Sequence, residues 1–131
     1  MKIILVADDD SESRALIRDA LAHQDYRIVE ACDGRETLEG VERERPDLVL
    51  LDLKMPRLDG FSVLDRLRAH PRFSNLPVAA VTARVPRSAA DTELTKRFDA
   101  YLTKPLNTRT LRFQVRELLS RPNPSRPTPA V

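Results

Sequence analysis

The chain has 131 residues, of which 41% are hydrophobic, and this suits one globular domain with a single packed core. It carries 22 basic and 20 acidic residues, and leaving out Arg121 and Arg126 gives 20 of each over residues 1–120. The body of the chain therefore lacks the basic excess typical of nucleic-acid binding. Its single cysteine, Cys32, excludes an internal disulfide and gives no zinc-site spacing.

The first apolar run, residues 3–7, is five residues long and leads directly into three aspartates. It is too short for a signal peptide or a membrane span. We therefore expect a cytoplasmic protein with no membrane partner.

Short apolar runs alternate with longer segments of helical periodicity, which predicts an α/β fold with a doubly wound, five-stranded parallel sheet and five helices. The third run has no polar alternation, as expected of a strand covered on both faces. The expected strands are residues 2–7, 27–31, 47–52, 77–82 and 100–103. Buried helix faces are indicated by apolar residues three or four positions apart: Ile17 and Leu21, Leu38 and Val41, Val63 and Leu67, and Leu111, Val115 and Leu118.

The predicted domain covers residues 1–120. Residues 121–131 hold four prolines and no acidic or aromatic side chain, so we expect a disordered tail or the start of a linker there. We assign no function to this segment.

Reactive polar groups stand at the ends of four predicted strands: Asp8 and Asp9, Asp52, Thr82, and Lys104. In an open parallel sheet, ligands bind beyond the carboxyl ends of the strands. A single carboxylate at such a position more often only caps the next helix. Four coordinated positions indicate one shared site.

Three of these groups, Asp8, Asp9 and Asp52, are carboxylates whose mutual repulsion requires a cation or a shared proton. Magnesium prefers oxygen ligands and is commonly held by one or two carboxylates together with a phosphate. No EF-hand pattern or His/Cys cluster favours calcium, zinc or iron. The sequence therefore predicts Mg²⁺ as the cofactor.

A cation beside Asp52 favours attack of its carboxylate on phosphorus, which forms an acyl phosphate. The Thr82 hydroxyl and the Lys104 ammonium then have the chemistry to hold two phosphoryl oxygens. This pattern predicts phosphorylation of the chain itself, not turnover of a substrate.

Four motifs resemble those of the receiver domains of two-component response regulators, and the resemblance covers about residues 2–119. They are ILVADDD at 4–10, LDLKMPRLDG at 51–60, VTA at 81–83 and YLTKP at 101–105. The resemblance implies a chemotaxis-regulator-like, flavodoxin-like fold with strand order 2-1-3-4-5. It also implies that a histidine kinase, a phosphotransfer protein or acetyl phosphate supplies the phosphoryl group to Asp52.

The resemblance further implies roles for individual residues. Asp9, Asp52 and the Lys54 backbone carbonyl would bind magnesium, and Asp8 would act through a bound water or the local field. The peptide bond between Lys104 and Pro105 is expected to be cis.

In the same family, Thr82 and Tyr101 would be the switch pair that reorients on phosphorylation, although Tyr101 also suits an ordinary edge-strand aromatic. The change would reach the surface formed by helix 4, strand 5 and helix 5, and there control an output protein or effector domain that the sequence does not identify. A homodimer of the phosphorylated form is one candidate assembly.

The sequence departs from the family pattern at two positions. Arg97 stands where receivers usually carry a helix-ending glycine, and arginine adopts a left-handed φ less readily. We therefore expect helix 4 to end differently. Ala100 replaces a commonly acidic neighbour of Tyr101.

Lys54 and Arg84 stand two residues after Asp52 and Thr82, at the rim of the predicted site. There they would reach the phosphoryl group or block the attacking water, which predicts a long-lived phosphorylated state. The alternative is that both are solvated surface charges.

On the last helix, one side is expected to carry an aromatic residue among arginines, opposite the buried face. This candidate partner face consists of Arg109, Arg112, Phe113 and Arg116. A lone exposed phenylalanine needs no such explanation, so both interpretations stand.

Three other functions compete with a signalling switch. An aspartyl-phosphate hydrolase would be similar at Asp52, but Leu53-Lys54 follows without the second aspartate such enzymes carry. A flavodoxin relative would need a phosphate-cradling loop and aromatics around a flavin, and the chain has no tryptophan. A phosphorylation-independent interaction domain is the third.

Overall fold

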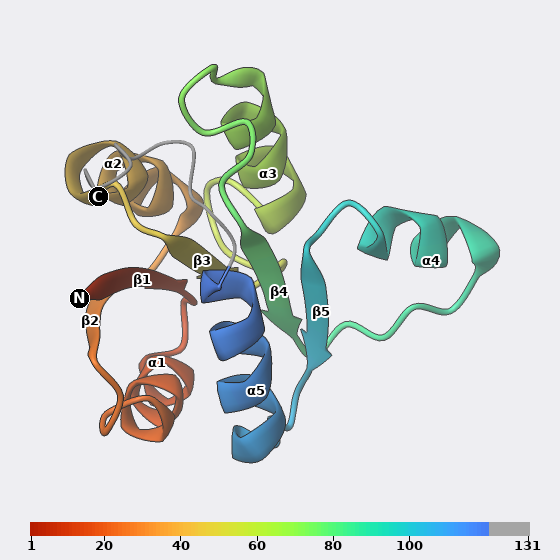
Figure 1. Ribbon diagram of the computed structural model, residues 1–131. Helices are drawn as coiled ribbons and strands as arrows, with labels where there is room; N and C mark the ends of the chain where they lie inside the picture. Colours follow the sequence, from red (N-terminus) through yellow and green to blue (C-terminus); the bar gives the residue numbers. More distant parts are fainter. Residues whose placement is uncertain (121–131) are drawn as a thin grey trace.

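The computed structural model describes residues 1–120, which form a parallel sheet between two layers of helices (Figure 1). The sheet has five strands in the order β2-β1-β3-β4-β5, and every neighbouring pair is parallel. This confirms the expected fold and strand order. The strands are β1 (Lys2–Ala7), β2 (Tyr26–Ala31), β3 (Leu48–Leu51), β4 (Val78–Thr82) and β5 (Ala100–Thr103). The predicted tail, 121–131, lies outside the described residues.

One helix follows each strand. The helices are α1 (Ser11–Ala20), α2 (Gly34–Glu44), α3 (Gly60–Ala69), α4 (Ala89–Thr95) and α5 (Thr108–Leu119). Each begins after a residue whose side chain accepts a backbone N–H of the first turn, which satisfies a donor that the helix itself leaves unpaired. These capping residues are Asp10, Asp33, Asp59, Ser88 and Asn107.

The core lies in two layers because β3 and β4 are buried at every residue and face helices on both sides. One layer joins alternate strand residues to α2 and α3, including Val41, Val63 and Leu67. The other joins the remaining residues to α1 and α5, including Ile17 and Leu111. The helix faces that the sequence predicted are the faces that pack.

β1 and β5 have the predicted ends, and the ends of the other three strands differ from the predicted ones by at most one residue. β2 begins at Tyr26, and β4 begins at Val78 because Pro77 has no N–H for the ladder, although its carbonyl accepts the Val49 amide at 3.0 Å. β3 is shorter at both ends than the predicted 47–52. These shifts leave Asp52 just beyond its strand.

Helix α4 ends without a left-handed residue, as the arginine at position 97 led us to expect. Its C-cap, Lys96, has right-handed φ and ψ of −68° and −13°, and the amides of Arg97 and Phe98 bond back to Leu94 and Thr95 at 3.2 Å. The Arg97 guanidinium pairs with Asp65 of α3. Within residues 1–120, no helix is long and apolar enough to cross a membrane.

Candidate functional site

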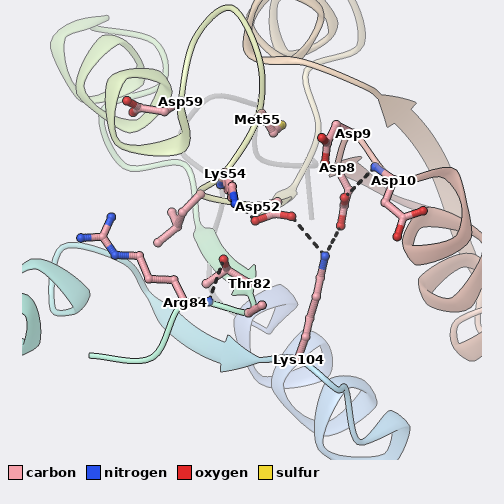
Figure 2. A pocket seen from close by; sticks show the side chains of 12 residues that line it. Asp8, Asp9, Asp10, Asp52, Lys54, Met55, Asp59, Thr82, Arg84 and Lys104 are labelled. Atoms are coloured by element: carbon pink, nitrogen blue, oxygen red, sulfur yellow. Dashed lines mark hydrogen bonds and ion pairs between the residues drawn. The ribbon is translucent and has the colours of Figure 1, made fainter. Parts of the chain in front are cut away.

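Four neighbouring strands bring their polar groups to one edge of the sheet (Figure 2). Asp8 follows β1, Asp52 follows β3, Thr82 ends β4 and Lys104 follows β5. The registers place Ala7 beside Leu51 and Thr82 beside Thr103, so the groups that follow are neighbours too. They line a cleft of about 730 Å³. The structure thus brings the predicted residues together.

Lys104 bridges the two buried carboxylates of this cleft. Its Nζ donates to Oδ2 of Asp8 at 2.7 Å and to Oδ2 of Asp52 at 3.1 Å. Asp8 is 1% exposed and Asp52 6% exposed, so a charged partner is needed to offset their desolvation. The peptide bond between Lys104 and Pro105 is cis, as expected.

One contact in the cleft was not predicted. The Ser13 hydroxyl lies 3.2 Å from the Lys104 Nζ. Ser13 is in the first turn of α1, where Asp10 both caps the helix and accepts the Ser13 hydroxyl at 3.2 Å. Its only signal in the sequence is a place one turn after the acidic motif.

The environment shifts the pKa values of both charged partners. Burial raises the pKa of the Asp8 carboxyl, and the hydrogen bond from Lys104 only partly offsets this. For Lys104, burial lowers the ammonium pKa, but the hydrogen bonds to Asp8 and Asp52 outweigh it and the pKa is raised. Lys104 is therefore a cation at neutral pH.

The three carboxylates meet the requirements of a hard cation. One oxygen from each of Asp8, Asp9 and Asp52 can be chosen so that all lie within 4.8 Å of one another. Asp9 is exposed, whereas the other two are buried, so the cluster opens to solvent on one side. Lys104 contacts only two of the three. An all-oxygen donor set with excess negative charge fits Mg²⁺.

The loop after β3 holds the backbone of Lys54 against Asp52. The Lys54 amide donates to Oδ1 of Asp52 at 3.1 Å. The loop closes where the Gly60 amide donates to the Leu53 carbonyl at 3.1 Å. A Cβ on Gly60 would lie 2.7 Å from the Leu53 Cα and 2.8 Å from the Asp52 carbonyl oxygen, so only glycine fits this close approach.

The two predicted switch residues meet at the backbone of Arg84. The Arg84 amide donates to the Thr82 hydroxyl oxygen at 3.3 Å, and the Tyr101 hydroxyl donates to the Arg84 carbonyl at 2.6 Å. Thr82 is 1% exposed. Partial burial raises the pKa of the Tyr101 phenol. A change at Thr82 therefore has a short covalent and hydrogen-bonded path to Tyr101.

The two rim residues differ from each other. Lys54 and Arg84 are both exposed and both line the cleft. The Arg84 side chain, however, points away from the Asp52 carboxylate (Figure 2), and its guanidinium contacts Phe61 and Asp91 instead. Direct contact with a phosphoryl group requires this side chain to move.

The candidate partner face on α5 is present as a surface. Phe113 is 57% exposed, Arg109 and Arg116 are exposed, and Arg112 is half-buried. The opposite side of the helix carries the buried residues Leu111, Val115 and Leu118.

Comparison with known proteins gives a consistent result. Residues 4–116 match the family model of the response regulator receiver domain. Response regulator MprA of Mycolicibacterium vanbaalenii is 40% identical over 121 residues, which are 92% of this chain and 52% of that protein. The chain thus spans about half the length of this curated relative.

Solved structures agree. The receiver domain of the Francisella response regulator 1452 has a TM-score of 0.81 at 31% identity, over 92% of this chain and 98% of that one. The receiver domain of sensor histidine kinase PA1611 from Pseudomonas aeruginosa PAO1 has a TM-score of 0.81 at 27% identity, with the same coverage. That structure has a magnesium ion coordinated in its active site cleft. The present chain therefore belongs to the response regulator receiver domains, the phosphoacceptor signalling modules of two-component systems.

Proposed function

We propose that Asp52 is the residue that accepts the phosphoryl group in this receiver domain. The observation that carries the proposal is the setting of its carboxylate. One oxygen accepts the Lys54 amide at 3.1 Å, the other accepts the Lys104 ammonium at 3.1 Å, and the residue lines an open cleft. A carboxylate held in this way is oriented for attack before a donor arrives.

The donor would be a phosphohistidine on a histidine kinase or phosphotransfer protein, or acetyl phosphate. An oxygen of Asp52 attacks phosphorus and a P–O bond forms, while the P–N bond to the imidazole breaks or, with acetyl phosphate, the P–O bond to the leaving acetate breaks. The leaving imidazole takes up a proton. Lys104 and the Thr82 hydroxyl would then each bind a phosphoryl oxygen, because both line the same cleft as Asp52.

Asp8, Asp9, Asp52 and the Lys54 backbone carbonyl would hold Mg²⁺. When bound, the ion supplies positive charge that offsets the three carboxylates and the incoming phosphoryl group. Both oxygens of Asp8 already have partners within the protein. They accept hydrogen bonds from the Asp10 amide at 2.9 Å and from the Lys104 ammonium. We therefore assign it a share in the field of the site, directly or through a bound water.

Phosphorylation would shift the balance between two conformations, and Thr82 and Tyr101 would pass the change through Arg84 to α4, β5 and α5. Residues 1–120 would form this switch unit. The output protein or effector domain would read the α4-β5-α5 surface, with the partner face Arg109, Arg112, Phe113 and Arg116, or the phosphorylated chains would dimerise there. We propose a cytoplasmic regulator that catalyses only its own phosphorylation and dephosphorylation, without direct binding of nucleic acid or membrane.

Intact-mass analysis with acetyl phosphate and Mg²⁺ tests this function. The wild-type chain should gain one labile phosphoryl adduct, and Asp52→Asn should gain none. Omitting Mg²⁺ or adding excess chelator should suppress the adduct in the wild type. A full adduct on the Asp52→Asn chain, or steady turnover of phosphate esters, would reject the proposal in favour of another acceptor or of a phosphatase.

Lys54 and Arg84 would lengthen the lifetime of the phosphorylated state, as their positions at the rim suggest. Lys54→Asn and Arg84→Glu should each speed the loss of phosphate. Unchanged rates in both variants would leave these residues as solvated surface charges.

A further inference from the structure

Arg84 connects the candidate site to two elements that are distant in sequence. Its guanidinium carbon lies 5.4 Å from the ring centroid of Phe61 in α3, and its Nη2 lies 3.8 Å from Oδ1 of Asp91 in α4. Its backbone, in contrast, bonds to Thr82 and Tyr101. The main chain of Arg84 therefore contacts the two predicted switch residues, whereas its guanidinium pairs with a residue of α4.

Both contacts of the Arg84 guanidinium, with Asp91 and with Phe61, are weak. The Arg84 side chain is 53% exposed and that of Asp91 30% exposed, and an ion pair in this setting at 3.8 Å gains little because water screens it. The cation–π contact with the half-buried Phe61 ring is also of modest strength, because the guanidinium itself remains largely solvated. The side chain can leave this position at small cost.

A phosphoryl group on Asp52 would offer the guanidinium a stronger partner. It brings more than one negative charge and oxygen pairs that match the planar fork of arginine, and Arg84 lines the same cleft as Asp52. We propose that Asp91 competes with this phosphoryl group for Arg84, so that Asp91 sets how strongly the phosphorylated state is stabilised. Asp91 is then a positioning residue, and the inference rests on the proposed function of Asp52.

The competition also has a consequence for α4. None of its seven residues is buried, so side-chain contacts at its surface matter more than core packing for holding it in place. Asp91 accepts the Arg87 amide at 3.1 Å within its own segment, but its ion pair with Arg84 reaches the end of β4. Transfer of Arg84 to the phosphoryl group would release that link and loosen α4.

Binding of beryllium fluoride with Mg²⁺, an analogue of the phosphoryl group, tests the competition in four proteins: wild type, Asp91→Asn, Arg84→Gln and the double variant. Asp91→Asn should bind about two- to fivefold more tightly, the range that corresponds to an exposed ion pair. Arg84→Gln should bind more weakly. In the Arg84→Gln background, Asp91→Asn should change nothing, because no guanidinium remains to be released.

A matched control is Glu93→Gln, which removes the same charge from the same helix at a residue paired only locally, with Lys96 at 3.0 Å. It should leave the affinity unchanged. The half-life of the aspartyl phosphate should follow the same pattern and lengthen about two- to fivefold in Asp91→Asn only when Arg84 is present.

Equal tightening by Asp91→Asn in both backgrounds would reveal a general field effect and overturn the inference, as would no tightening at all. Urea unfolding of each variant identifies any loss of folding. If the wild type itself neither binds the analogue nor gains a phosphoryl adduct, the proposed function of Asp52 fails first and the inference falls with it.

Discussion

Helices α3 and α4 follow neighbouring strands of the same sheet but are held to the protein very differently. α3 buries Gly60, Val63, Leu64 and Leu67 in the core, whereas α4 buries no residue. α3 also closes the loop that places Lys54 against Asp52. The firmly packed helix therefore supports the loop at Asp52, whereas we propose that the loosely packed α4 moves when the site changes, as elements at the low-stability end of a fold do.

Truncation of a leucine in each helix should change the free energy of unfolding by very different amounts. Leu67→Ala in α3 should lower the free energy of unfolding by about 2–5 kcal/mol, because it leaves a cavity in a site that is 2% exposed. Leu94→Ala in α4 should cost less than about 1 kcal/mol, because Leu94 is only half-buried. Urea denaturation measures both. Equal costs would mean that α4 is as firmly packed as α3.

The next prediction concerns the ion pairs of Lys104 in the cleft. Lys104→Met should lower stability by about 2 kcal/mol in the presence of chelator, because Asp8 and Asp52 lose their shared cation. Added Mg²⁺ should restore most of the loss.

Lys96→Met is the control for Lys104, since Lys96 is 66% exposed and pairs only within its own segment. It should change stability by less than about 0.5 kcal/mol, with or without Mg²⁺. A Lys104→Met deficit that Mg²⁺ leaves untouched would argue that the three carboxylates do not share an ion.

Tyr101→Phe acts at the junction between the two regions. Loss of the hydrogen bond to the Arg84 carbonyl should cost about 1 kcal/mol. Hydrogen exchange should speed up in α4 and the segment before it while α3 keeps its protection. Faster exchange in both helices would show that Tyr101 supports the whole core and not the link to α4.

The smallest effect on stability is expected on the exposed face of α5. Phe113→Asp should change unfolding by about 0.5 kcal/mol or less, because the side chain is 57% exposed. Self-association of the phosphorylated protein, followed by sedimentation velocity, should nevertheless weaken. Asn75→Asp adds the same charge at an exposed position outside α5 and should have no effect. Unchanged association of Phe113→Asp would remove this face as a dimer contact.

The sequence predicts the site well where position along the chain decides the geometry. Asp8, Asp52 and Lys104 each follow a strand of the parallel sheet, and the carboxyl ends of parallel strands meet at one edge. The apolar pattern that locates the strands was therefore enough to predict that these three residues lie close together. The observed strand ends differ from the predicted ends by at most one residue. Pro77 explains one of these differences, because it has no N–H to donate.

The sequence fails where a side chain's direction depends on distant elements. Ser13 reaches Lys104 only because the first turn of α1 lies beside the end of β5 in the folded protein. Arg84 lines the cleft, but its orientation away from Asp52 depends on Phe61 and Asp91, which other helices supply. Local sequence patterns do not predict contacts between side chains of elements that are distant in sequence.

Chemical localisation of the phosphoryl group distinguishes Asp52 from its neighbours, because the three carboxylates Asp8, Asp9 and Asp52 lie close together. Borohydride reduces an aspartyl phosphate to homoserine, which peptide mass analysis identifies after treatment with acetyl phosphate and Mg²⁺. Homoserine is expected at position 52, with Asp8 and Asp9 unmodified. Homoserine at Asp8 or Asp9, or at no position in a chain that carries the adduct, would contradict the proposed role of Asp52.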